Sequence, residues 1–558
     1  MSRELPTDLV FVPLGGTEEI GMNFNLYGLR SGNHEDWIIV DLGITFGDDT
    51  MPGVEIVVPD ASFAQEKREY LHGIILTHGH EDHLGAVPYL WDQLRCPVYA
   101  TPFTAALLRK KIHENIGKSE CEIIEVPLKG KFDIGPFSVE LLSLTHSMPE
   151  PNGLAIRTHF GTIFHTGDWK FDPEPVIGEI SDSEALIKLG DEGVLACIGD
   201  STNVFVEGKS GSEASLKVNL TKLIGKCEGK VAVTCFASNV ARLKTIFEAA
   251  RDNGRAICLL GRSLWRINAA ARETGYLSDL PSFLEAEETL GLADDEILFV
   301  CTGSQGEPRA ALRRIAAGNH KNIKFSDGDT VIFSSRIIPG NELPISRLHN
   351  QLVTRGIEVI STNNDEVHVS GHPAQEELIE MYQFIRPEIS VPVHGEQRHL
   401  KKHIEIAKEC QVPQTVLANN GSIIRLAPGG VEKIDQAKVG RYSIEGGRMH
   451  SIEGEVVRDR NRIIYNGTAT ITLVVDKHGN ICDTPQLAGH ALFDEDEKPY
   501  ILENLMKQVE SNLHEISEEN RQVDSKIAEV ARITIRKSFR ITHGKNPLVN
   551  VHVVRLNT

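Results

Sequence analysis

The stretch "LTHGHEDHLGAV", residues 76–87, places three histidines and a carboxylate beside a short apolar run. That run predicts a buried strand, and the "LGAVPYLWDQL" that follows predicts a helix. His78 and His80 face the same side because side chains alternate along an extended segment, whereas Asp82 and His83 lie at the turn into the helix. One short loop can therefore offer nitrogen and oxygen ligands to two neighbouring metal ions, and Zn²⁺ or Mn²⁺ suits this mixture. The alternative is a solvated, histidine-rich turn.

Three further candidate ligands follow other predicted strands. They are His146 in "LTHSMPE", Asp168 in "FHTGDWKFD" and His394 in "VPVHGE". Taken singly, each is more readily explained as a structural residue than as a ligand. All three nevertheless follow a buried strand, as His78 does. This shared position favours a metal site to which all four residues contribute.

The composition of the 558-residue chain favours a globular protein of roughly two to four domains. The chain has no apolar run of about 18 residues, no signal-peptide pattern at its start and no Cys-x-x-Cys pair among its nine cysteines. We therefore expect a cytoplasmic protein that does not span a membrane. The net charge of −20 counts against a nucleic-acid partner, because phosphate binding needs basic surface. Composition alone favours a small-molecule enzyme, although 58 Lys and Arg residues leave room for a local basic groove.

The hydrophobic pattern divides the chain into four segments. Residues 1–205 show short strands separated by Gly-rich turns, and residues 206–365 alternate strands with helices, which predicts a parallel sheet covered on both faces. Residues 366–454 return to the first pattern, with the strand-like stretches "EVHVSGH" and "ISVPVHGE", and residues 455–558 indicate a small α/β domain. A parallel α/β unit inserted into the first domain explains this order.

At these motifs the chain resembles a known family. The H-x-H-x-D-H pattern with a later histidine and aspartate resembles the metallo-β-lactamase fold, an α/β αββα sandwich with a dinuclear metal site. An inserted α/β unit followed by a returning histidine resembles the β-CASP nuclease branch of that superfamily. Within this branch, "PLGGTEEIGMN", "DSTN", "TGSQGEP", "VHVSGH" and "VPVHGE" resemble the ribonuclease J family. The resemblance covers essentially the whole chain, including the C-terminal α/β domain, and no metal position departs from it.

The resemblance implies roles for individual residues. One metal ion would take His78, His80 and His146, and the other would take Asp82, His83 and His394, with Asp168 bridging the two. Asp41, in "WIIVDLG", would hold a ligand or loop in place. Asp200 of "GDSTN" and His372 of "VSGH" would be catalytic residues beside the metals, together with Asp82. A histidine at position 394 favours RNA over DNA.

The activity implied by the resemblance is hydrolysis of RNA phosphodiester bonds. Two metal ions would supply a hydroxide at neutral pH and clamp the phosphoryl oxygens, leaving 3′-hydroxyl and 5′-phosphate ends. His372 would donate a proton to the leaving oxygen or stabilise its charge, because imidazole titrates in the useful range. The resemblance further implies a 5′-to-3′ exonuclease that prefers 5′-monophosphate ends and also cleaves internally. Such an enzyme would serve RNA processing, including rRNA processing, and RNA decay as a homodimer or homotetramer.

A pocket for the terminal nucleotide and its 5′-monophosphate is implied at the edge of the inserted sheet. Its candidate residues are Ser238, Asn239, His368, Val369, Ser370, Gly371 and His372. Ser238 and Asn239 precede a predicted helix, where free backbone N–H groups attract phosphate. The alternative is that Ser238 only caps this helix and that His368 packs within a strand. Arginines on the same edge could form a basic groove, or could simply face solvent: Arg262, Arg266, Arg309, Arg313, Arg314 and Arg336.

Two other functions fit parts of the same sequence pattern. A small-molecule metallo-hydrolase is permitted by the fold and the metal ligands, but it needs neither an inserted domain nor a phosphate anchor. A non-catalytic RNA-binding platform is a second alternative, and the complete set of metal positions argues against it. Replacing Asp82 and His83 would separate these classes, because a platform would keep its full function.

Overall fold

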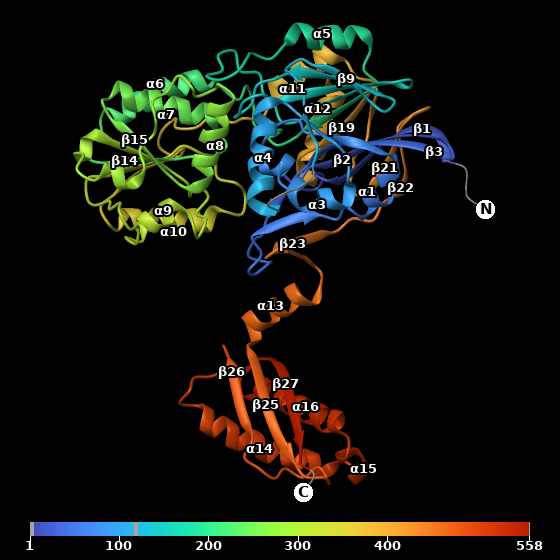
Figure 1. Ribbon diagram of the computed structural model, residues 1–558, viewed down its shortest axis with the longest axis vertical. Coiled ribbons are helices and arrows are strands. Elements are labelled where there is room, and N and C mark those ends of the chain that lie inside the picture. Colours follow the sequence, from blue (N-terminus) through green and yellow to red (C-terminus); the bar gives the residue numbers. More distant parts are fainter. Residues whose placement is uncertain (1–4, 117–120, 557–558) are drawn as a thin grey trace. The chain divides into compact units, whose positions relative to one another are not determined.

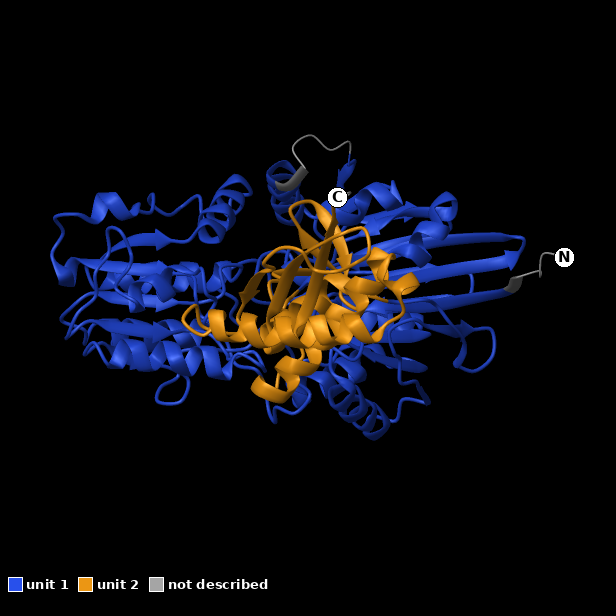
Figure 2. Cartoon of the chain, turned by 90° about the horizontal axis from the view of Figure 1, so that it is seen from below, with its two compact units in different colours: residues 1–45, 58–439 blue, residues 46–57, 440–558 orange. Residues whose placement is uncertain are grey.

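The computed structural model describes residues 5–116 and 121–556. The chain forms two units, one of residues 1–45 and 58–439 and one of residues 46–57 and 440–558 (Figure 2). All candidate site residues lie in the first unit. Within the described ranges, no helix has the length and apolar character needed to cross a bilayer. The nine cysteines are all free.

Two β-sheets pack face to face in the first unit and share one buried core. Phe11 and Ile38 of the first sheet lie in the same apolar cluster as Val139 and Ile198 of the second. The eight-stranded sheet has the order β22 (Glu432–Gln436), β21 (Ser422–Ala427), β1 (Leu5–Gly15), β2 (Phe24–Gly32), β3 (His34–Leu42), β6 (Leu71–Ile75), β7 (Val98–Ala100), β8 (Ile123–Glu125). The seven-stranded sheet has the order β20 (Gln414–Thr415), β19 (Ile389–Val393), β13 (Ala196–Asp200), β12 (Gly161–His165), β11 (Asn152–Thr158), β10 (Phe137–Ser143), β9 (Lys131–Ile134).

Helices cover the outer faces of the two sheets (Figure 1). Met381 and Ile406, on two of these helices, share a buried cluster with Phe164 of β12. On the other side, Trp37 of β3 packs against Phe63 with 5.7 Å between ring centroids. The helices are α1 (Ser62–Glu66), η1 (Arg68–Tyr70), α2 (Glu81–Leu84), α3 (Val87–Leu94), α4 (Pro102–Ile116), α5 (Ser183–Glu192), α11 (Gln375–Ile385) and α12 (Gln397–Glu409). The predicted αββα sandwich is confirmed.

The inserted segment forms an all-parallel sheet with helices on both faces (Figure 1). Its strand order is β15 (Ala256–Leu260), β16 (Ile297–Cys301), β14 (Val231–Thr234), β17 (Thr330–Phe333), β18 (Glu358–Ile360). Its helices are α6 (Glu213–Ile224), α7 (Val240–Asp252), α8 (Arg262–Glu273), η2 (Ala286–Thr289), η3 (Asp294–Glu296), α9 (Ala311–Ala316) and α10 (Glu342–Val353). The parallel sheet predicted from alternating strands and helices is confirmed.

The stretch "EVHVSGH" is a loop between β18 and α11, so its interpretation as a strand was wrong. Its carbonyl oxygens accept hydrogen bonds from side chains rather than from a neighbouring strand. The Val367 oxygen accepts from Ser334 Oγ at 2.7 Å, and the His372 oxygen accepts from Asn203 Nδ2 at 3.0 Å. The alternating residues belong to a loop that is hydrogen-bonded on one side to the sandwich, through Asn203, and on the other to the inserted domain, through Ser334.

The carboxyl ends of several strands meet at one edge of the sandwich. Strands β12, β13 and β19 run parallel, with Asp200 at the end of β13 opposite Val393 at the end of β19. Residues that follow these strands therefore emerge on the same side. The residues directly after β12 and β19 include Asp168 and His394.

The second unit is built around a three-stranded sheet with the order β26 (Gln486–His490), β25 (Thr468–Val475), β27 (Leu548–Arg555). One face of β25 is buried, because every second residue from Ala469 onward packs with Val509 and Ile535 of the helices. The helices of this unit are α13 (Glu455–Asn466), α14 (Lys498–Glu515), α15 (Glu518–Arg521) and α16 (Asp524–His543). A further four-stranded sheet has the order β24 (Arg448–Ser451), β23 (Arg441–Glu445), β5 (Ile56–Pro59), β4 (Thr45–Phe46).

Candidate metal centre

The loop after β6 and the ends of three other strands bring seven polar side chains together. The first group is His78, His80, His146 and Asp168, and the second is Asp82, His83, Asp168 and His394. In each group, one potential ligand atom per residue lies within 4.8 Å of all the others. Asp168 belongs to both groups, so its carboxylate lies between two clusters of donors. The seven residues that the sequence analysis singled out as ligands are therefore neighbours in space.

The imidazoles of the first group are buried or partly buried, and each has a lowered pKa. Burial holds the pKa of His78 well below its usual value, and burial lowers the pKa of His80 to about 4. Burial and then the neighbouring His80 lower the pKa of His146. Nδ1 of His80 lies 3.0 Å from Nε2 of His78 and 3.1 Å from Nε2 of His146. Neutral imidazole nitrogens converging in this way are the form in which histidine binds a metal.

The second group couples two carboxylates to two histidines. Burial alone would raise the pKa of Asp168, but His394 and His83 beside it hold that pKa well below the usual value. Burial likewise opposes ionisation of Asp82, and His83 outweighs it, so the pKa of Asp82 is also lowered. Asp168 is buried and Asp82 is partly exposed, and these carboxylates in turn raise the pKa values of His83 and His394. The set of nitrogen and carboxylate donors fits two divalent ions such as Zn²⁺ or Mn²⁺.

Asp41 fixes the loop that carries these ligands. It is the penultimate residue of β3 and has a left-handed backbone, φ 63°. Its carboxylate accepts hydrogen bonds from the backbone N–H of Thr77 at 2.8 Å and from Nδ1 of His83 at 2.7 Å. Because Nδ1 of His83 is occupied by Asp41, Nε2 is the nitrogen that faces Asp168, at 3.2 Å.

A third cluster joins Asp200 and His372 to the second group. Nδ1 of His372 donates to Asp200 at 2.8 Å, and one-fifth of the His372 side chain (21%) is exposed. Burial lowers the pKa of His372, but Asp200 and then Asp168 outweigh burial and raise it. Thr202, which the sequence analysis did not single out, lies 2.9 Å from His394 Nδ1 and donates to Asp200 at 2.7 Å. Thr202 is part of the "DSTN" motif, which is the sequence feature that could have identified it.

The loop 368–372 lies directly against the ligands. His146 Nδ1 donates to the Gly371 oxygen at 2.5 Å. A Cβ at Gly371 would lie 2.8 Å from the His146 ring, so only glycine allows this close approach. Ser370 Oγ accepts from Asn203 Nδ2 at 2.7 Å and from the backbone N–H of His372 at 3.2 Å.

A buried arginine connects this loop to the inserted domain. Arg242 is fully buried and forms a two-bond ion pair with Glu213, at 2.7 and 3.1 Å. It also donates to His368 Nδ1 at 3.3 Å, which leaves His368 Nε2 as the protonated nitrogen. Asn239, rather than Ser238, caps α7, because its side chain accepts from the Arg242 N–H at 2.8 Å. Arg242 was missed in sequence because it lies within an apolar helical pattern.

The predicted edge arginines do not act as one set. Arg266 pairs with Glu114 at 2.8 Å and lies 3.5 Å from Glu81. Arg336 instead donates to Asn203, next to the loop that contacts the ligands. Arg313 and Arg314 lie on the short helix α9, with Arg314 exposed. Among these arginines, Arg336 is thus bonded to a residue beside the centre.

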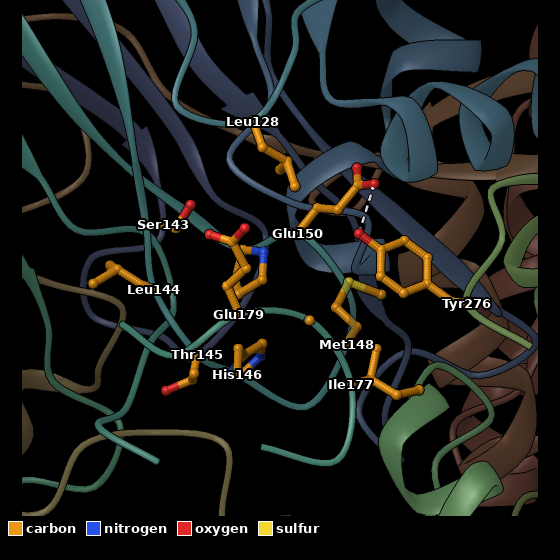
Figure 3. A pocket seen from close by; sticks show the side chains of 12 residues that line it. Leu128, Ser143, Leu144, Thr145, His146, Met148, Glu150, Ile177, Glu179 and Tyr276 are labelled. Carbon is orange, nitrogen blue, oxygen red and sulfur yellow. Dashed lines mark hydrogen bonds between the residues drawn. The ribbon is translucent and has the colours of Figure 1, made fainter. Parts of the chain in front are cut away.

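A pocket adjoins the first group of ligands (Figure 3). Its lining includes His146, Met148 and Glu150 from the sandwich and Tyr276, which follows α8 of the inserted domain. The Tyr276 hydroxyl donates to Glu150 at 3.0 Å, shown as a dashed line in Figure 3. The sandwich and the inserted domain of the first unit thus meet beside the candidate ligands.

The fold and the site define a class of protein, the metallo-hydrolases of the β-lactamase superfamily. The family model of the β-lactamase superfamily domain matches residues 37–188, and that of the Zn-dependent metallo-hydrolase RNA specificity domain matches residues 356–413. Models of the ribonuclease J β-CASP domain and of the ribonuclease J C-terminal domain match residues 228–352 and 455–556.

Relatives narrow the class to one family. The chain is 41% identical to ribonuclease J of Sinorhizobium meliloti, covering 98% of both chains. It is 34% identical to ribonuclease J of Helicobacter pylori, covering 99% of this chain and 80% of that one. The chain belongs to the ribonuclease J family, whose members are hydrolases acting on RNA phosphodiester bonds. A solved structure, a protein of unknown function from Enterococcus faecalis V583, aligns with TM-score 0.52 and 17% identity over 75% of this chain and 100% of that chain, which supports the fold.

Proposed function

We propose that this chain is a two-metal ribonuclease that removes nucleotides from the 5′-monophosphate end of RNA and also cleaves internally. One observation carries the proposal: the Asp168 carboxylate is shared by two donor groups, and the loop 368–372 contacts one of them directly. A shared carboxylate fits a pair of metals, and a polar loop beside it fits a phosphate. Neither a small ester substrate nor a non-catalytic platform requires both features.

The two donor groups would each hold one divalent ion, Zn²⁺ or Mn²⁺. His78, His80 and His146 would bind one ion, Asp82, His83 and His394 the other, and Asp168 both. When bound, the pair would lower the pKa of water towards about 7 and clamp the oxygens of the phosphodiester. Asp41 would orient His83 so that its Nε2 faces the metal. The 2.7 Å contact between the Asp41 carboxylate and Nδ1 of His83 supports this role.

His372 would be the proton donor to the leaving oxygen. Its Nδ1 is taken by Asp200, so Nε2 is free to face the substrate. Asp200 and Asp168 raise the pKa of His372 against the effect of burial, which favours the protonated form. Partial exposure of the ring gives the substrate access to it. Asp200 therefore orients His372 and stabilises its charge.

The terminal phosphate would bind between Ser238, His368 and Ser370. Arg242 takes up Nδ1 of His368, so the proton on Nε2 can be donated to a phosphate oxygen. Gly371 brings this loop within contact of His146. A 5′ end seated here would lie at a fixed distance from the metals, which gives stepwise removal in the 5′-to-3′ direction.

RNA with a 3′ label and different 5′ ends tests this function. We expect 5′-monophosphorylated RNA to be degraded faster than 5′-triphosphorylated RNA, because the added phosphates overfill the pocket, and the 3′-labelled RNA to shorten one nucleotide at a time. Equal rates for both ends would contradict the pocket. The control is Asp82→Ala with His83→Ala, which should abolish cleavage; retained function in this variant would favour the platform.

We also propose a homodimer or homotetramer in the cytoplasm. The free cysteines fit a reducing compartment. Within the second unit, Tyr465, Tyr500 and Ile541 are each 73% exposed, and burial of such side chains would stabilise an interface. Light scattering on the purified chain measures the mass, and a monomer at micromolar concentration would contradict the proposal.

A further inference from the structure

The loop that follows β13 carries an exposed aromatic side chain close to the metal centre. Phe205 is 50% exposed, although Val204 before it is fully buried. In the described part of the first unit, Phe205 and Tyr70 are the aromatic residues among the exposed large apolar side chains, and Tyr70 is 36% exposed. A single exposed apolar side chain is common on protein surfaces, so the significance of Phe205 rests on its neighbours.

The chain fixes Phe205 near the ligands. Thr202 contacts His394 at 2.9 Å, and Asn203 donates to the His372 oxygen at 3.0 Å. Two peptide units separate Asn203 from Phe205, so their Cα atoms are at most about 7 Å apart. A turn closed by the Val206 N–H and the Asn203 oxygen, 2.8 Å apart, holds this segment. Phe205 is therefore held close enough to the centre to contact an RNA strand that enters the site.

An arginine and a histidine contact the ring. The Arg398 guanidinium lies over the Phe205 ring, 5.8 Å from its centroid, and the His399 ring meets it edge-on at 5.2 Å. Arg398 is 62% exposed and also donates to Glu396 at 2.8 Å. Arg336 donates to Asn203, two residues away in the chain. An exposed aromatic ring with one arginine over it and a second arginine bound to the same loop is a combination with which proteins bind single-stranded nucleic acid without reading its sequence.

We propose that Phe205 is a stacking platform for one nucleobase of the RNA strand next to the metal centre, with Arg398 completing the platform and Arg336 contacting the adjacent phosphate. This inference rests on the proposed ribonuclease function and adds the residue that holds a base. Stacking is indifferent to base identity, because every base has a π face. The platform thus explains how an acidic chain holds RNA of any sequence at this point.

The first measurement compares Phe205→Ala with the wild-type protein on a single-stranded, 5′-monophosphorylated RNA. We expect KM to rise about tenfold with little change in kcat, because stacking holds the substrate rather than the transition state. Phe205→Trp should keep the wild-type KM. Tyr70→Ala, the matched control at the other exposed aromatic residue named above for the first unit, should leave both constants unchanged. Equal KM values for Phe205→Ala and the wild-type protein would overturn the proposal.

The second measurement identifies the stacked base. A series of RNAs carries one abasic site each, moved stepwise from the 5′ end. At one position, the abasic site should raise the wild-type KM as much as Phe205→Ala does, and the two changes together should add nothing further. Additive effects at every position would mean that Phe205 acts through the loop structure, which would overturn the proposal. A merely structural residue would not show this position dependence.

The two experiments separate this inference from the function on which it rests. If the wild-type protein degrades RNA and Phe205→Ala does so with the same KM, only the stacking platform is wrong. If the metal-loaded wild-type protein degrades no RNA, the proposed function is wrong, and the stacking platform at Phe205 is wrong as well. Thermal unfolding of Phe205→Ala should match the wild-type protein, because the ring is half exposed.

Discussion

At the scale of single residues, hydrogen-bond partners decide which nitrogen each histidine presents. Asp41 occupies Nδ1 of His83, Asp200 occupies Nδ1 of His372, and the Gly371 oxygen occupies Nδ1 of His146. In each case Nε2 is left for a metal ion or a substrate. Such partners fix both the tautomer and the ring orientation, so losing one changes the site without removing a ligand.

Ser370→Trp should separate the two proposed cleavage modes. Ser370 accepts from Asn203 and from the His372 N–H, so it lies in the loop beside the centre. An indole here would fill the space for the terminal phosphate, and we expect removal of 5′ nucleotides to fall about 100-fold. Internal cleavage should persist because it needs no seated 5′ end. The measurement is cleavage of linear and circular RNA; Ser370→Ala is the control, and loss of both modes would contradict the pocket.

At the scale of elements, the site depends on loops that follow strand ends. Apolar runs ending in a polar residue predicted β6, β10, β12 and β19, and the residues after them converge as expected. Periodicity could not identify the loop 368–372, because its alternating residues contact partners from two lobes instead of a neighbouring strand. Phe205 and Arg242 were also missed. Their importance comes from contacts across more than a hundred residues, which a local pattern does not contain.

Gly371→Ala should weaken the metal site without touching a ligand. An added Cβ would lie 2.8 Å from the His146 ring, so the loop or the imidazole must shift. We expect metal affinity to fall about 10- to 100-fold, as for loss of other groups that orient a ligand. Competition with a chelator measures the affinity. Gly430→Ala is the matched control, because its Cβ would meet only the end of the Gln414 side chain, at 3.1 Å; equal affinities in all three proteins would contradict the prediction.

At the scale of the whole molecule, a buried polar network lies behind the candidate site. The chain has a net charge of −20. Behind the site, His403 is buried and its pKa is lowered. It lies 2.8 Å from Ser201 Oγ and 2.9 Å from the Tyr382 hydroxyl. Burial lowers the pKa of His403 to about 4. This network joins β13, α11 and α12, which support the strand ends that carry the site.

His403 should make folding sensitive to mild acid. Its pKa of about 4 in the folded state is below the value of about 6.5 expected when unfolded, so the unfolded chain binds more protons between these pH values. Stability therefore falls as the pH is lowered through this window, by an amount on the order of 3 kcal/mol from this residue. Denaturant unfolding from pH 7 to pH 4 measures it. His403→Gln, which keeps hydrogen-bonding groups, should lose less stability over that range; identical slopes would contradict the assignment.

The most direct test of the central claim is the number of metal ions bound per chain, measured by elemental analysis of the wild-type protein and of Asp168→Ala. The two donor groups share the Asp168 carboxylate. The account therefore predicts two divalent ions per wild-type chain and a loss of both the ions and RNA cleavage in the variant. A wild-type protein that cleaves RNA with one ion or none, or an Asp168→Ala variant that keeps two, would contradict it.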